Sequence, residues 1–189
     1  APVSGIRGER RDALTQTIDL APTLLDFFGK PIPPDMRGRS LLPVIRENAP
    51  GHAYALFGYF NGPINITDGQ YVYMRARVDD AVQMPHYTMM PTAMDNRLPV
   101  ERLQKAEFAA PFAFTKGCPT FRIPVPAQNT KLPRGGHRLY NLAVDPKQTQ
   151  PIEEKETEAR LLRAMGQLLA ENDAPEAIYA AYGIPKPEK

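Results

Sequence analysis

Proline is the residue that most limits what this chain can fold into. The sequence holds 21 prolines among 189 residues, about twice the usual ~5%, and they are spread along the chain instead of forming one linker. Proline breaks the interior of helices and of central strands. The sequence therefore predicts short elements between irregular segments, and the prolines at 31, 33 and 34 exclude regular structure in residues 31–45.

Apolar periodicity predicts three helices. The first covers residues 20–28, with Asp19 as its N-cap and Gly29 as the residue that ends it. The strongest pattern covers residues 153–171, and a weaker one covers 99–109. The apolar side chains of the first and last helices repeat at helical spacing, which predicts one buried face on each: Leu20, Leu24, Leu25 and Phe28, then Leu161, Leu162, Met165, Leu168 and Leu169.

Strand signals lie between these helices. Asp68-Gly69 is a strong hairpin signal, and in the segment after it Arg75 and Arg77 alternate with apolar residues, which predicts that they lie on an exposed sheet face. We therefore expect an α+β fold: a small antiparallel sheet of three to four strands packed against a long C-terminal helix, preceded by a short helix and a Pro-rich irregular segment. The expected strands are residues 53–60, 64–67, 70–78 and 137–142.

Composition narrows the class of protein. Apolar residues make up 42% and charged residues 23%, which is typical of a globular domain. A net charge of +2 without a Lys/Arg block predicts no nucleic-acid partner, and the apolar runs are too short for a membrane span. A single cysteine excludes an internal disulfide. We expect a soluble protein, and the sequence does not choose between cytoplasm and periplasm.

Three stretches carry a family resemblance. "TIDLAPTLLDFFGKPIPPDMRGRSLLPVI", "INITDGQYVYMRA" and "HRLYNLAVDPKQTQPI" resemble, in this order and spacing, the C-terminal portion of sulfatases of the alkaline phosphatase superfamily. The resemblance covers about residues 12–171, and "YTMMPTAMDN" with "PFAFTKGCPTF" is similar to one bacterial branch. It implies that residues 1–50 are the tail end of the catalytic domain and its connector. Residues 51–189 would then be the C-terminal subdomain, with a long loop insertion at 80–137.

The resemblance also implies where the chemistry lies. Such enzymes use a formylglycine made from Cys or Ser beside a divalent cation, usually calcium, and both are expected in a missing N-terminal catalytic domain. The substrate of the intact enzyme would be a sulfated small molecule or saccharide. We therefore expect this chain alone to be inactive. The helix at 20–28, deprived of that domain, would expose apolar side chains that favour self-association.

Cys118 does not fit the formylglycine signature. That signature is C/S-x-P-x-R, whereas here Pro119 follows the cysteine directly and Arg122 comes four residues after it. We interpret Cys118 as a buried or half-buried structural thiol in a loop, and a thiol that faces substrate is the alternative. The three histidines, at 52, 86 and 137, are too far apart in sequence for metal-ligand spacing. The sequence predicts no catalytic residue and no metal ligand in this chain.

Substrate contacts are predicted from the long loop. Lys116 and His86 could donate to an anionic substrate, and Tyr87 lies beside His86. The alternative is that Lys116 and His86 are solvated and Tyr87 is packing. Arg37 and Arg39 are expected to anchor a loop to the missing domain. The methionines of this loop are expected to fill irregular gaps.

Two alternative functions stay open. A phosphonate or phosphate monoester hydrolase, or a phosphoglycerol transferase, shares the superfamily's architecture and differs in metals and nucleophile. A stand-alone binding or interaction domain would use the same fold without catalysis. The sequence before Ala1 would separate the enzymes, because a Thr nucleophile with two metals favours phosphoryl chemistry.

Overall fold

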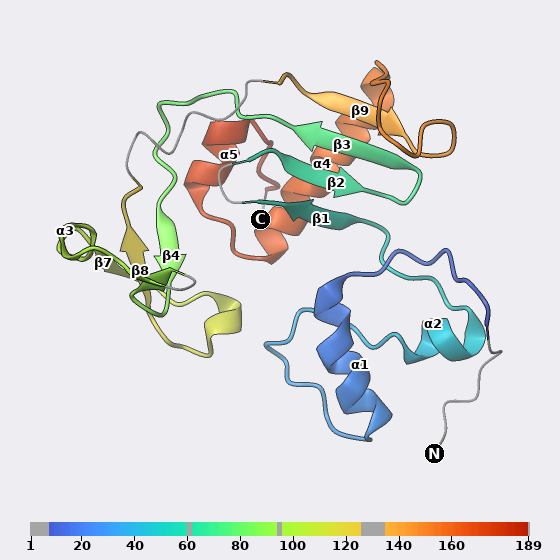
Figure 1. Cartoon of the computed structure of the whole chain (residues 1–189), viewed down its shortest axis with the longest axis horizontal. Coiled ribbons are helices and arrows are strands. Elements are labelled where there is room, and N and C mark those ends of the chain that lie inside the picture. The colour runs from blue at the N-terminus through green and yellow to red at the C-terminus, as the bar shows by residue number, and fades with distance from the viewer. Residues whose placement is uncertain (1–7, 60–61, 94–95, 126–134, 189) are drawn as a thin grey trace.

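A computed structural model describes residues 8–59, 62–93, 96–125 and 135–188. The chain has three parts, a central body, an N-terminal arm and an insert (Figure 1). The body is the main sheet with the two C-terminal helices. The N-terminal arm, residues 8–52, lies beyond one edge of the sheet, and the insert, residues 84–125, extends to one side. No helix in these ranges is long and apolar enough to cross a membrane.

The main sheet has four antiparallel strands in the order β1-β2-β3-β9. The hairpin between β2 and β3 turns at Asp68-Gly69, as predicted: Gly69 has φ +91°, and the Asp68 carboxylate accepts from the Gln70 and Tyr71 amides at 3.0 and 2.7 Å. All four strands fall inside the predicted segments or match them. Their bounds are β1 Ala55–Gly58, β2 Ile64–Thr67, β3 Tyr71–Arg75 and β9 Arg138–Asn141.

Two helices cover one face of this sheet (Figure 1). Helix α4, Lys155–Glu171, lies where apolar periodicity predicted it, and α5, Glu176–Tyr182, follows after a short turn. Tyr73 sits opposite Ile66 on one side and Leu139 on the other, so the three form a row against the helices. The fold class predicted from sequence is confirmed. The most deeply buried core residues are Ile66, Tyr73, Leu139, Leu161, Met165, Ala181 and Tyr182.

The exposed arginine face predicted for the third strand is wrong. Arg75 donates from Nε to the Tyr182 carbonyl at 2.7 Å and from Nη2 to the Gly183 carbonyl at 2.8 Å. Arg77 donates from Nη2 to the Val82 carbonyl at 2.7 Å, and its side chain is 7% exposed. Both cations therefore bind backbone carbonyls, and those of Arg75 lie at the C-terminal end of α5, where a positive charge is favoured. Helix α5, which covers this face, was not predicted from the sequence.

The N-terminal arm holds a short 3₁₀ turn, η1 Thr17–Asp19, and the helices α1 Leu20–Phe27 and α2 Leu42–Glu47. Helix α1 ends as predicted: Gly29 has φ +64°, and the Lys30 amide donates to the Leu25 carbonyl at 2.8 Å. The exclusion of regular structure from residues 31–45 is wrong at its end. Pro43 sits in the first turn of α2, where its missing N–H breaks no hydrogen bond.

The insert contains small sheets where an irregular loop was expected. Strands β4 His86–Thr88, β8 Thr120–Ile123 and β7 Glu107–Ala109 form a three-stranded sheet in this order, and β5 Thr92–Ala93 pairs with β6 Asn96–Arg97. The helix predicted at 99–109 is wrong beyond its first turn: α3 covers Val100–Leu103, and β7 pairs with β8 instead. Residues 94–95 and 126–134, within the expected loop, lie outside the described residues.

Candidate functional site

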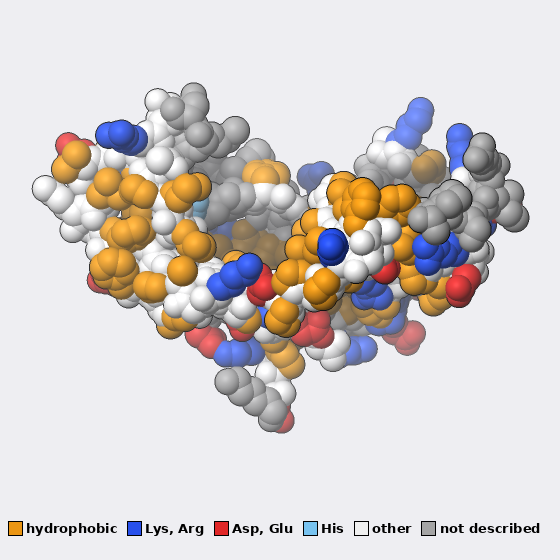
Figure 2. Space-filling model, turned by 90° about the horizontal axis from the view of Figure 1, so that it is seen from below, with side chains coloured by type: hydrophobic (Ala, Val, Ile, Leu, Met, Phe, Trp, Pro, Cys, Tyr) orange, Lys and Arg blue, Asp and Glu red, His pale blue; other side chains and the backbone are white. Residues whose placement is uncertain are grey.

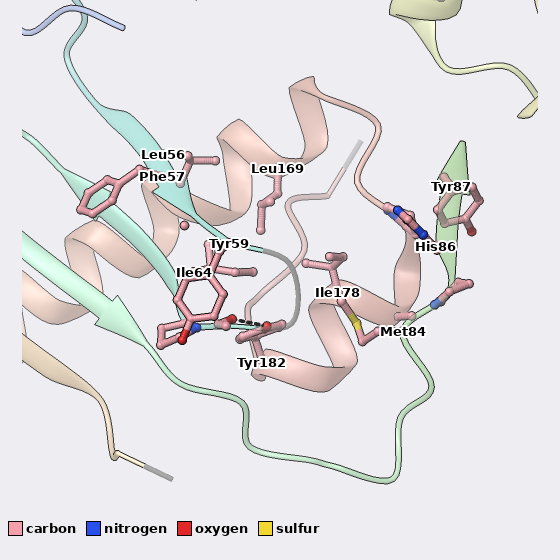
Figure 3. Close-up of a pocket in the computed structure, with 16 residues that line it drawn as sticks. Leu56, Phe57, Tyr59, Ile64, Met84, His86, Tyr87, Leu169, Ile178 and Tyr182 are labelled. Atoms are coloured by element: carbon pink, nitrogen blue, oxygen red, sulfur yellow. Dashed lines mark hydrogen bonds between the residues drawn. The ribbon is translucent and has the colours of Figure 1, made fainter. Parts of the chain in front are cut away.

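A cavity of about 480 Å³ lies where the body meets the insert. Strand β1, helix α5 and strand β4 supply its walls (Figure 3). The lining is mainly apolar because the end of the sheet and the buried face of α5 both contribute apolar side chains to it. Its aliphatic side chains come from β1, β2, α4, α5 and the segment just before β4: Leu56, Ile64, Leu169, Ile178 and Met84.

Tyrosines and one histidine add polar atoms to this apolar cavity. Tyr59 and Tyr182 line it from the body, and His86 and Tyr87 line it from β4. The Tyr182 hydroxyl donates to the Gly62 carbonyl at 2.5 Å, a bond drawn in Figure 3. Burial raises the pKa of Tyr182, so this hydroxyl stays protonated and serves as a donor. The cavity therefore suits a ring with an apolar face and a few hydroxyl groups.

The structure brings two of the three predicted substrate residues together. His86 and Tyr87 are neighbours on β4, where both are half-buried and line the cavity. Lys116 is not part of that lining: it follows the 3₁₀ turn η2, Ala113–Thr115, with φ +53°, and its Nζ lies 3.4 Å from Asp35 Oδ2. Its side chain is 69% exposed. A role for these residues in binding stays a prediction.

An aromatic cluster holds Tyr87 in place. Its ring meets Phe112 edge-on, with centroids 5.2 Å apart, and Phe112 stacks on Phe114 at 5.3 Å. The Ala113 amide beside this cluster donates to Asp173 Oδ2 at 2.8 Å, which ties the insert to the turn between α4 and α5. Sequence reasoning missed this anchor because Asp173 and Ala113 are 60 residues apart.

A buried carboxylate organises the N-terminal arm. Asp19 is fully buried and accepts from the Gln16 amide at 2.8 Å and the Arg39 amide at 3.0 Å, and it pairs with His52 Nε2 at 2.8 Å. Burial alone would raise the pKa of Asp19, yet these three hydrogen bonds outweigh it and lower the pKa. Asp19 is the N-cap residue of α1, as predicted, but its side chain makes no cap bond to that helix. Asp19 instead joins η1, the loop at Arg39 and the end of the arm.

Cys118, His52 and His137 are not part of the cavity lining. Cys118 is exposed, so the predicted buried or half-buried thiol is wrong, and its backbone closes the turn after η2 by bonding Thr115. His52 binds Asp19, while His137 accepts from the Ala76 amide at 3.2 Å. Burial, with Arg75 nearby, lowers the pKa of His137. Across the described residues, no group of three or more His, Cys, Asp or Glu could hold a metal ion.

The fold is that of an α+β domain with an apolar, tyrosine-lined cavity. The residues that the structure describes contain no group that could hold a metal ion. Residues 2–97 match the family model for the C-terminal domain of N-sulphoglucosamine sulphohydrolase. The chain belongs to this family, and the sulfatase C-terminal portion predicted from the three motifs is confirmed. None of the curated proteins matches it.

A solved structure shares the fold at low identity. A Bacteroides thetaiotaomicron protein, described in the context of the metabolism of multiple glycosaminoglycans, is similar with a TM-score of 0.57 and 18% identity, over 95% of this chain and 32% of that one. A protein solved in complex with its substrate D-glucosamine-2-N,6-O-disulfate gives a TM-score of 0.47 and 14% identity, over 84% and 24%. The chain thus spans about a third or less of these structures.

Proposed function

We propose that this chain is the C-terminal part of a sulfuric ester hydrolase, which supports the active-site cleft of the intact protein and partly lines it. The family match over residues 2–97 carries this proposal. The body supplies a rigid scaffold, and the insert extends from it with His86 and Tyr87 on β4. Recognition residues are commonly held on loops and short elements at the edge of such a scaffold.

The catalytic groups of the intact enzyme would come from its N-terminal part. A formylglycine would provide the nucleophile, and a calcium ion would stabilise the negative charge of the reacting sulfate. The described residues do not fit either group: no metal-holding cluster is found among them, and the order Cys118-Pro119 departs from the C/S-x-P-x-R signature. We therefore assign binding and orientation, but no bond-breaking step, to this chain.

We further propose a sulfated saccharide as substrate, as the family's name suggests. A pyranose ring has apolar faces that stack on aromatic side chains and hydroxyl groups that hydrogen-bond. The cavity offers both, with Tyr59 and Tyr87 as rings and His86 as a polar group. Lys116 lies outside the cavity lining, and its exposed positive charge suits a sulfate group.

Steady-state kinetics of the intact protein tests the proposal. We expect hydrolysis of an aryl sulfate and of N-sulfoglucosamine, and no hydrolysis by the 189-residue chain alone. In the intact protein, His86→Ala and Lys116→Ala should each raise KM roughly ten- to a hundredfold with little change in kcat, since a lost hydrogen bond to a charged group is worth ~1.5–3 kcal/mol. Unchanged KM in both variants would show that the insert packs against the rest of the fold and does not bind substrate.

Two other results would redirect the assignment. Faster hydrolysis of phosphate or phosphonate esters than of sulfates would favour the phosphoryl-transfer branch of the superfamily. Tight saccharide binding without turnover in the intact protein would favour a non-catalytic binding domain.

A further inference from the structure

A second pocket, of about 450 Å³, lies between the insert and the turn that joins α4 to α5. Its lining and that of the cavity described above share Tyr87 and Pro175, so the two spaces are neighbours. Figure 2 shows the insert as a lobe rich in apolar side chains, with a hollow between it and the rest of the molecule. The size of the second pocket is within the range of small-molecule sites. Its other lining residues are Ala109, Ala110, Pro111, Phe112, Ala113 and Asp173.

The insert side of this pocket combines small side chains with aromatic rings. Three of the eight lining residues are alanines, whose short side chains leave the space open. The rings of Tyr87 and Phe112 stand almost perpendicular, at 82°, with centroids 5.2 Å apart, and Phe114 supports Phe112 by stacking on it. Two perpendicular rings form an apolar corner of fixed angle. This corner suits the apolar face of a saccharide ring.

The body side of the pocket carries a carboxylate. Asp173 lies in the turn after α4, and its Oδ2 accepts from the Ala113 amide at 2.8 Å. A carboxylate has about four acceptor sites, so this bond leaves further sites for a ligand. Asp173 has φ +54°, a left-handed conformation that Asp and Asn tolerate better than most residues. The turn therefore holds a hydrogen-bond acceptor in a fixed place beside the apolar corner.

Charge selects the kind of ring that this pocket takes. The Asp173 carboxylate accepts hydrogen bonds from hydroxyl groups, and it repels sulfate and carboxylate groups. The pocket therefore suits a ring that carries hydroxyl groups and no negative charge. Tyr87 belongs to both linings, and neighbouring rings of a saccharide are joined through a single oxygen atom. The two rings of one disaccharide can thus lie on either side of Tyr87.

We propose that the second pocket binds an uncharged saccharide ring, next to the sulfated ring in the first cavity. This inference rests on the function proposed above, and it specifies a substrate of at least two rings. Asp173 accepts from the hydroxyl groups of the uncharged ring. Tyr87 and Phe112 pack against the apolar face of that ring.

NMR titration of the intact protein with two unsulfated saccharides tests the proposal, because these probes carry no sulfate that can be hydrolysed. The probes are N-acetylglucosamine and a disaccharide in which N-acetylglucosamine is linked to glucose. We expect the disaccharide to have a Kd at least about tenfold lower. The second ring adds a hydrogen bond to a carboxylate and a contact with aromatic rings, and each of these raises affinity several-fold.

Two substitutions should remove this advantage in different ways. Asp173→Asn keeps an acceptor for the Ala113 amide and suits φ +54°, but it removes the charge, so the affinity ratio of the two probes should fall at least about threefold. Ala110→Leu places a larger side chain in the pocket at an exposed position and should reduce the ratio to less than about twofold. Neither should change the Kd of N-acetylglucosamine.

Glu171→Gln is the matched control. Glu171 is the last residue of α4, and its exposed carboxylate lies outside the lining of the second pocket. This substitution removes the same charge as Asp173→Asn from a nearby position. The affinity ratio of the two probes should therefore stay at the wild-type value.

Three results would overturn the inference. Equal affinity for the two probes would mean that the second pocket takes no ring in the intact protein. A tenfold ratio that survives both substitutions would place the second ring elsewhere. Weaker binding of N-acetylglucosamine itself in both variants would mean that these residues only position β4.

Hydrolysis of N-sulfoglucosamine by the same sample separates this inference from the proposed function. Hydrolysis together with equal affinity for the two probes would refute the second site and leave the sulfatase assignment standing. A tenfold affinity ratio without hydrolysis would refute the sulfatase assignment and leave the second site standing.

Discussion

The body and the insert are both antiparallel sheets, yet they bury their side chains very differently. In the body, Ile66 and Leu161 are fully buried and Tyr73 is 2% exposed. In the insert, Phe108 is 76% and Met90 65% exposed. The body has helices α4 and α5 as a second layer, whereas the insert has the single-turn helix α3 and strands of two to four residues. A small sheet without a second layer leaves its apolar side chains uncovered.

The comparison separates the part of the chain that has a complete hydrophobic core from the parts that do not. The body completes a core of its own, because its helices cover the row of Ile66, Tyr73 and Leu139. The arm and the insert keep only small buried centres, around Asp19 in the arm and around Ile123 in the insert. We infer that the body holds the fold and that the arm and insert present surface. The following substitutions test that difference.

The largest effect is expected in the body's core. Leu161→Ala should lower the free energy of unfolding by about 2–5 kcal/mol, because it removes a fully buried side chain of α4 and leaves a cavity. Phe108→Ala in the insert removes a larger side chain, yet it should change the stability of the 189-residue chain by less than about 0.5 kcal/mol. Urea denaturation followed by circular dichroism measures both.

Equal effects of the two substitutions would contradict the division into body and insert. A large effect of Phe108→Ala in the intact protein, but not in the 189-residue chain, would instead mean that the rest of the protein covers this side chain.

The arm depends on polar contacts more than on apolar packing. Asp19→Ala should lower the free energy of unfolding by about 2–4 kcal/mol, because the Gln16 and Arg39 amides lose their acceptor and each unsatisfied donor is worth ~1–3 kcal/mol. Asp12→Ala removes an exposed carboxylate from the same arm and is the control. Thermal unfolding measures the stability loss of Asp19→Ala and of the control Asp12→Ala. A stability loss no greater than the control's would mean that apolar contacts hold the arm.

The body's hairpin carries a pH-dependent contribution through Asp68. Burial by itself would raise its pKa, but the Tyr71 and Gln70 amides and Arg160 lower it below the ordinary 3.8. A depressed folded-state pKa gives stability that is present above 3.8 and is lost as pH falls through the lower folded value. Asp68→Asn should therefore cost about 1 kcal/mol at pH 7 and almost nothing at pH 2. Urea denaturation at pH 7 and at pH 2 measures the stability that Asp68→Asn removes. An equal loss of stability at the two pH values would refute this pH dependence.

The sequence predicted the body better than the parts around it. Strands and helices of the body carry strong local signals, such as Asp68-Gly69 and the leucine spacing of α4. Helix α5 was missed, although Pro175 at its N-cap and Gly183 after its end, with φ +56°, mark its bounds. Without α5, nothing in the sequence showed that Arg75 would bind carbonyls instead of facing water.

The site and the insert were harder to predict because they depend on distant contacts. Residues 107–109 have a plausible helical pattern, and only their pairing with β8, about a dozen residues away, makes them a strand. Asp19 was correctly placed at the N-cap of α1, yet its side chain pairs with His52, which is 33 residues away. The cavity combines residues from 56 to 182, so local patterns named His86 and Tyr87 without showing what surrounds them.

The smallest effect separates two roles for Lys116. Its ion pair with Asp35 is exposed, so a double-mutant cycle with Lys116→Ala and Asp35→Ala should give a coupling of only ~0.2–1 kcal/mol in the stability of the intact protein. If Lys116 also binds substrate, Lys116→Ala raises KM while Asp35→Ala leaves it unchanged, because Asp35 carries the wrong charge for a sulfate. If Lys116 only ties the insert to the arm, both substitutions change KM by the same small factor. Kinetics of the two single variants, set beside their thermal unfolding, therefore decides whether Lys116 contacts substrate or only joins the insert to the arm.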